Sequence, residues 1–97
     1  MGYKLSEKAA DDFAGIFEYT LVNFGELHAQ SHLLDLERIM ALLVDSPNIG
    51  YECNEITDGI RRFNHKHHAI FYRILVNEML VVRILHHQMN PYLHFPD

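Results

Sequence analysis

Apolar residues recur at spacings of three and four through the first half of the chain, which is the pattern of amphipathic helices. Over residues 7–24 and 26–45 these apolar positions are Ala9, Phe13, Ile16, Phe17, Leu21 and Phe24, then Ala29, Leu33, Leu36, Met40 and Leu43. Ser6 is a good N-cap, Gly25 separates the two helices, and Pro47 follows the second. Two helices joined this closely predict an antiparallel αα-hairpin.

The second half of the chain changes to the β-branched and aromatic pattern of strands. The predicted strands are 60–63, 68–76 and 79–86, with turns at 64–66 and 77–78, and residues 3–5 make a short first strand. Residues 47–58 hold turn formers without periodicity and predict a surface loop. We therefore expect one α+β domain over residues 1–97. A helical hairpin packs on a three-stranded antiparallel meander in the order β-α-α-β-β-β, and the first strand joins the sheet edge.

Composition and charge narrow the function classes. A chain of 97 residues with 48% hydrophobic residues has room for one core. Its net charge is −5, with three Lys/Arg against eight Asp/Glu in residues 1–48 and five of each in residues 49–97. This balance argues against direct reading or coating of nucleic acid, because phosphate binding needs local positive charge. One cysteine, Cys53, and no long apolar run predict a cytoplasmic protein without a membrane span.

The positive charge of the predicted sheet lies in four arginines, Arg61, Arg62, Arg73 and Arg83. Strand alternation places Arg73 opposite the apolar set Ile70, Tyr72 and Ile74, and Arg83 opposite the set Leu80, Val82 and Ile84. If those sets pack on the helices, Arg73 and Arg83 share the outer face with one of the other two arginines. Such a face is either simply solvated or a docking patch for an acidic partner.

Histidines gather at two places, His65, His67 and His68, and His86 and His87. Neighbouring strand residues point to opposite faces, so we expect neither a metal site nor a cofactor. A ribonuclease site built from Arg61, Arg83 and His86 has the right residue types, but nothing in the sequence holds them in place. Phosphate-binding and nucleophile motifs are absent from the sequence. A binding protein is therefore favoured over an enzyme.

Several segments, in order and spacing, resemble the ParE branch of the RelE/ParE toxin superfamily. They are Tyr3-Lys4-Leu5-Ser6 with Ala9-Ala10-Asp11-Asp12, the turn Asn23-Phe24-Gly25, the P-x-x-G phrase in residues 46–50, the G-x-R phrase Gly59-Ile60-Arg61, the segment 68–73 and the C-terminal signature 82–91. The resemblance covers nearly the whole chain. It implies the same fold, a helical hairpin over a small antiparallel sheet.

The resemblance also implies function. It implies a type II toxin that inhibits DNA gyrase by binding, without catalysis or cofactor, and that is silenced by a ParD-like cognate antitoxin in a hetero-oligomer. The expected target contacts are Arg61, Arg62, Arg73, Arg83, His86 and Met89, and the expected antitoxin contacts are Phe13, Phe17, Met40 and Leu43. The RelE branch leaves an alternative, a ribosome-dependent mRNA endoribonuclease using Arg61, Arg83 and His86. Because superfamily toxins are often basic and this chain is acidic, hydrophobic burial has to supply more of the antitoxin affinity.

Overall fold

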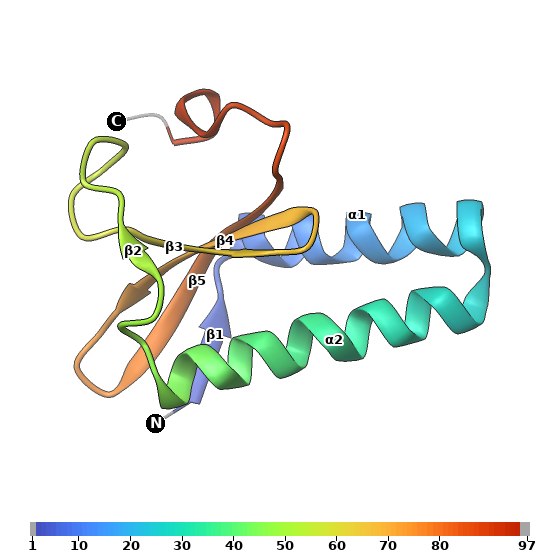
Figure 1. The fold of residues 1–97 in the computed structure, drawn as a ribbon, viewed down its shortest axis with the longest axis horizontal. Coiled ribbons are helices and arrows are strands. Elements are labelled where there is room, and N and C mark those ends of the chain that lie inside the picture. The colour runs from blue at the N-terminus through green and yellow to red at the C-terminus, as the bar shows by residue number, and fades with distance from the viewer. Residues whose placement is uncertain (1, 96–97) are drawn as a thin grey trace.

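A helical hairpin lies against one face of a five-stranded sheet in the computed structural model, which describes residues 2–95 (Figure 1). The elements are β1 (Gly2–Leu5), α1 (Glu7–Phe24), α2 (Glu26–Asp45), β2 (Tyr51–Glu52), β3 (Arg61–His65), β4 (His68–Ile74), β5 (Glu78–His86) and a short 3₁₀ helix η1 (Pro91–Leu93). The turn of the hairpin projects beyond the sheet, so the outer ends of both helices lack a sheet beneath them (Figure 1). The predicted α+β fold and the bounds of both helices are confirmed.

The helix ends are set by the residues that the sequence indicated. The Ser6 hydroxyl accepts a hydrogen bond from the Ala9 amide at 3.0 Å and donates one to the Val82 carbonyl at 2.7 Å, which ties the start of α1 to β5. Gly25 has φ 90°, in the left-handed region that favours glycine, and it ends α1 and begins α2.

The sheet has the order β1-β5-β4-β3-β2, in which β1 is parallel to β5 and the other pairs are antiparallel. The first strand therefore joins the edge of the sheet, as expected. The strand β2 lies inside the segment predicted as a loop, because two residues carry no periodicity. The turn predicted at residues 64–66 lies instead at Lys66 and His67, and the turn predicted at 77–78 ends before Glu78, where β5 begins.

An irregularity in β5 corrects the predicted alternation. Phe71 pairs with Arg83 but its neighbour Tyr72 pairs with Val81, so Val82 has no partner in β4. An extra residue of this kind reverses the inside–outside order of the strand. As a result the helix-facing core takes Met79, Val81 and Ile84 rather than Leu80 and Val82, and Val82 packs on the opposite face.

Both faces of the sheet carry a core. The helix-facing core contains Ala9, Ile39, Met40, Leu43, Ile70, Tyr72, Met79, Val81 and Ile84. The outer core contains Cys53, Ile60, Ala69, Phe71 and Leu85, with Ile56, Val82 and Phe95 packed against it. The outer face was predicted to carry arginines, yet its centre is apolar, because the loop before β3 and the C-terminal tail cover it. Loop and tail are thereby held on one side of the sheet and the hairpin on the other.

Candidate functional site

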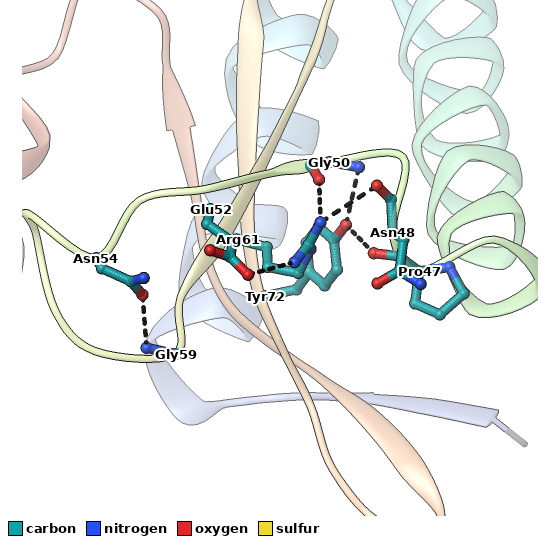
Figure 2. Close-up of polar contacts among 8 residues, drawn as sticks. All are labelled: Pro47, Asn48, Gly50, Glu52, Asn54, Gly59, Arg61 and Tyr72. Carbon is teal, nitrogen blue, oxygen red and sulfur yellow. Dashed lines mark hydrogen bonds and ion pairs between the residues drawn. The ribbon is translucent and has the colours of Figure 1, made fainter.

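Buried Tyr72 anchors the loop that precedes β3 (Figure 2). Its hydroxyl donates to the carbonyl of Pro47 at 2.5 Å and accepts from the amide of Gly50 at 3.2 Å. A side chain at Gly50 would place its Cβ against the Tyr72 ring and 2.9 Å from the carbonyl of Arg62. The P-x-x-G phrase thus fits the hydroxyl of Tyr72. Pro47 supplies the carbonyl that accepts its hydrogen bond, and Gly50 supplies an amide donor without a Cβ that would clash with the ring.

Arg61, the first residue of β3, holds the same loop in place (Figure 2). Its guanidinium donates to the carbonyls of Gly50 at 2.6 Å and Asn48 at 3.2 Å, and it pairs with the Glu52 carboxylate at 3.4 Å. Only 17% of the side chain is exposed. The structure therefore gives Arg61, expected as a target contact, an internal role in fixing the loop.

Arg73 holds the far end of the loop on the outer face. It donates to the carbonyl of Asp58 and lies 3.5 Å from the Thr57 hydroxyl. Gly59 beside it has φ 78°, and its amide donates to the Asn54 side chain at 3.1 Å (Figure 2). These partners are neutral, so the charge of Arg73 keeps its capacity to attract an acidic group.

Arg83 forms a two-pronged ion pair with Asp12 of α1. Both of its contacts with the carboxylate measure 2.8 Å, and the Ile84 amide donates to the same carboxylate at 3.0 Å. The side chains are 13% and 15% exposed, and hydrogen bonding to Asp12 raises the pKa of Arg83 above its ordinary value. Sequence reasoning placed Asp12 off the apolar stripe. Its spacing, three residues after Ala9 and four before Ile16, was the available signal that it borders the buried face.

Arg62 lies on the outer face, in the same row of the sheet as Phe71 and Arg83. Its Nε donates to the Asn64 side chain at 2.8 Å, and its guanidinium lies 5.3 Å from the centre of the Phe71 ring, a cation–π contact. Arg62, Arg73 and Arg83 therefore share the outer face, as expected, whereas Arg61 is level with helix-facing Tyr72. Arg62 and Arg73 remain half-exposed over the outer core, while Arg61 and Arg83 hold the loop and α1.

The C-terminal tail crosses the outer face after β5. Phe95 packs edge-on against Phe71 with ring centres 5.0 Å apart, and the carbonyl of His94 accepts from Arg83 at 3.4 Å. Between these anchors and β5, Met89, Tyr92 and Leu93 are exposed apolar side chains. An open hollow of about 390 Å³ beside the tail is lined by Ser6, Glu7, Lys8, Thr57, Arg73, Val82, Arg83, His94 and Phe95.

The three residues of the ribonuclease hypothesis do not converge. Arg61 of β3 is level with Val81 of β5, whereas His86 of β5 is level with His65 at the other end of β3. Four residues along a strand and two strand spacings amount to about 13 Å and about 10 Å between the backbones of Arg61 and His86. Arg83 lies nearer to His86 in sequence, but its guanidinium is occupied by Asp12.

The hairpin corrects part of the expected antitoxin surface. Met40 and Leu43 are 1% and 0% exposed and belong to the helix-facing core, so they cannot contact a partner without unfolding. They lie on the stripe of α2 that meets the sheet, and periodicity alone does not separate a buried stripe from a binding one. Phe13 packs against the same core, and Phe17 is half-buried.

A different set of apolar side chains is exposed on the hairpin, which we call the hairpin strip. Its members are Tyr19, Val22, Phe24, Leu27 and Leu34. Most lie near the projecting turn, where no sheet covers the helices (Figure 1). Exposed apolar residues in this number on one projecting element are typical of a surface that binds another protein.

Within residues 2–95, no group of three or more His, Cys, Asp or Glu side chains is placed to hold a metal ion. Over the same residues no helix has the length and apolar character needed to cross a bilayer.

The arrangement of hairpin and sheet places the chain in a class of small α+β domains with a known structural example. A chain of the solved structure described as the chromosomal ParDE TA system from P. aeruginosa superposes with a TM-score of 0.76, covering 89% of this chain and 95% of that one at 23% identity. This likeness establishes the fold.

The sequence itself matches the family described as the ParE toxin of the type II toxin–antitoxin system parDE, over residues 3–91. The chain belongs to this ParE toxin family. Among similar proteins are Toxin ParE1 of Mycobacterium tuberculosis, 32% identical over 89 residues and 91% of each chain, and Toxin ParE1 of Caulobacter vibrioides, 28% identical over 92 residues and 95% of each chain.

Proposed function

We propose that this protein inhibits DNA gyrase by binding it, without catalysis, and that a ParD-like cognate antitoxin neutralises it in a cytoplasmic hetero-oligomer. One observation carries the non-catalytic part of the proposal: Arg61 and Arg83, the cations a ribonuclease would need, are held by Glu52 and Asp12. A cation paired in this way is not free to stabilise charge that develops on a scissile phosphate. We therefore assign the surface of this protein a role in binding its target and not in catalysis.

The proposed target surface is the outer face with its tail. Arg62, Arg73 and Met89 are at least partly exposed there, and Leu93 in the tail is 77% exposed. His86 pairs with His68, whose ring meets His32 of α2, so His86 lies at the helix-facing edge of this surface. Arginine is one of the residue types enriched among those that carry most of the binding energy in protein interfaces. Arg61 and Arg83 contribute by holding the loop and the tail that frame this surface.

The proposed antitoxin surface is the hairpin. Phe13 and Phe17 of α1 are half-buried, and the hairpin strip supplies exposed apolar side chains around the tip of the hairpin. An amphipathic helix laid against such an apolar surface buries its apolar side chains at spacings of three and four. The two proposed surfaces lie on opposite sides of the sheet, so each can be altered without touching the other.

A crossed pair of variants tests the proposal. In Leu93→Ser the tail loses an exposed apolar contact, and in Leu27→Ser the hairpin, where Leu27 is 82% exposed, loses one. Removing a leucine of this kind from an interface costs about 1.5 kcal/mol, about tenfold in affinity. Supercoiling and cleaved-complex assays with purified gyrase should show weaker inhibition by Leu93→Ser only. Antitoxin binding should weaken in Leu27→Ser only.

Two results would contradict the proposal. Wild-type protein that leaves gyrase supercoiling unchanged, and builds up no cleaved complex, would remove the target. Primer extension on translated mRNA that shows site-specific cuts, abolished by His86→Ala, would replace binding with ribonuclease activity.

A further inference from the structure

Histidine rings from three elements form a continuous cluster at the end of the sheet where the tail departs. His68 of β4 lies 5.5 Å from His32 of α2 and 5.7 Å from His86 of β5, measured between ring centres. His86 in turn lies 4.5 Å from His87 and stacks on His67 at 6.3 Å. We call these five residues the histidine cluster. Five rings at these separations pack well when they are neutral and repel one another when they are charged.

The charged groups around the cluster offer little compensation for added protons. From α2 the carboxylate of Asp35 faces this region, but it is shared by His65 at 2.7 Å, Arg38 at 2.8 Å and Lys66 at 3.1 Å. Hydrogen bonding to His65, then to Arg38, holds the pKa of Asp35 well below its usual range. Burial, Lys66 and the neighbouring histidines oppose a proton on His32 and lower its pKa, although Asp35 favours that proton.

One hydrogen bond at the start of the tail depends directly on protonation state. The Nδ1 atom of His86 accepts from the amide of Gln88 at 3.2 Å, which requires a neutral ring with a free lone pair on Nδ1. A protonated imidazole donates from both nitrogens, so two donors would then face each other. The Met89 amide donates to the His86 carbonyl at 2.9 Å, and the His87 amide to the His67 carbonyl at 2.8 Å. The first residues of the tail are thus seated on the cluster.

We propose that the histidine cluster is an acid-sensitive latch, which seats residues 88–90 against the end of β5 while its rings are neutral and releases them when it is protonated. Phe95 keeps its own contact with Phe71, so the far end of the tail stays in place. The effect is a loosened tail and not a detached one. Only its consequence, weaker gyrase inhibition in acid, rests on the proposed function.

The interior of the cluster supports this behaviour. Burial, followed by the charges of His32, His86 and other cluster members, lowers the pKa of His68 to about 4. Burial also lowers the pKa of His32. The Nδ1 of His68 is buried without a hydrogen-bond partner among the described residues. Packing of neutral rings therefore holds the centre of the cluster, and protons added at its rim weaken that packing.

Backbone ¹⁵N relaxation on the whole chain, with a chelator present, measures the proposed release. Between about pH 7.5 and about pH 5.5 the order parameters of amides 88–90 should fall from about 0.8 to below about 0.6. The Gly50 amide, bonded to Tyr72, should stay rigid and serves as the internal control. In His86→Asn the side-chain oxygen keeps an acceptor near the place of Nδ1 without a titrating ring, so the fall should disappear. The matched variant His94→Asn should behave as the wild type.

Three outcomes would overturn the latch. Amides 88–90 of the wild type could keep their order in acid, His86→Asn could respond as the wild type does, or Gly50 and β5 could lose order together with the tail. The last outcome would mean general acid unfolding. Because the readout is local order and not toxicity, failure of the latch is distinguishable from failure of the proposed function.

Discussion

Replacing Asp12 by alanine should destabilise the domain more than any other single change in its charged residues. The carboxylate holds the Arg83 guanidinium by two contacts of 2.8 Å and accepts the Ile84 amide at 3.0 Å. In Asp12→Ala, Arg83 is left 13% exposed without its counter-ion and the amide loses its acceptor. Removing one partner of a buried pair costs about 3–5 kcal/mol, and residual solvent access at this site favours about 3 kcal/mol. Small domains typically have stabilities of about 5–15 kcal/mol, so a loss of this size is a large fraction of the total.

Urea unfolding followed by circular dichroism measures this loss directly. For a domain of this size about 3 kcal/mol also lowers Tm by about 15 °C. Asp11→Ala is the matched control, because Asp11 is exposed and should change stability by less than about 0.5 kcal/mol. The double variant Asp12→Ala with Arg83→Met should recover part of the loss, since the uncompensated charge is gone. A loss below about 1 kcal/mol, or strictly additive effects in the double variant, would refute the buried-pair argument.

Three further outcomes are expected. Gly50→Ala should cost about 2 kcal/mol, because its Cβ meets the Tyr72 ring and a backbone carbonyl, and urea midpoints measure it. Tyr72→Phe should cost about 1–2 kcal/mol through the two lost hydrogen bonds, and loop amides should exchange faster while α1 is unaffected. Acid should lower the unfolding free energy between pH 6.5 and about 4. The folded chain binds the His68 proton later than the unfolded chain, and His68→Gln should flatten this part of the pH profile.

Local signals were sufficient to predict the helical layer. Ser6, Gly25 and Pro47 mark its ends, and the helix bounds follow from them and from the apolar spacing. The sequence-based prediction failed where two segments that are far apart in the sequence pair with each other. The unpaired Val82 in β5 leaves no trace in the alternation of its own strand, because Leu80, Val81 and Val82 are equally apolar. One unpaired residue then moved Val82 from the predicted inner face to the outer one.

The candidate site was predictable by residue type but not by partner. Arg61 and Arg83 were recognised as important charges, yet whether an arginine is free or paired depends on groups 11 and 71 residues away, at Gly50 and Asp12. Met40 and Leu43 show a second limit of prediction from the sequence. Sequence periodicity identifies an apolar stripe, and only tertiary packing decides whether the sheet or a partner covers it.

Ion pairs within the fold occupy much of the positive charge of this acidic chain. Of its eight Lys and Arg residues, Lys4, Arg38, Arg61, Lys66 and Arg83 form ion pairs within the described structure. On the hairpin, Glu7, Asp11, Glu18, Glu26 and Glu37 are exposed. An acidic partner segment would be repelled there, so contact with the hairpin strip has to draw its affinity from buried apolar area. The three other cations are Lys8 on α1 and Arg62 and Arg73 across the sheet, so most of the positive charge left for an acidic partner lies on the face opposite the hairpin.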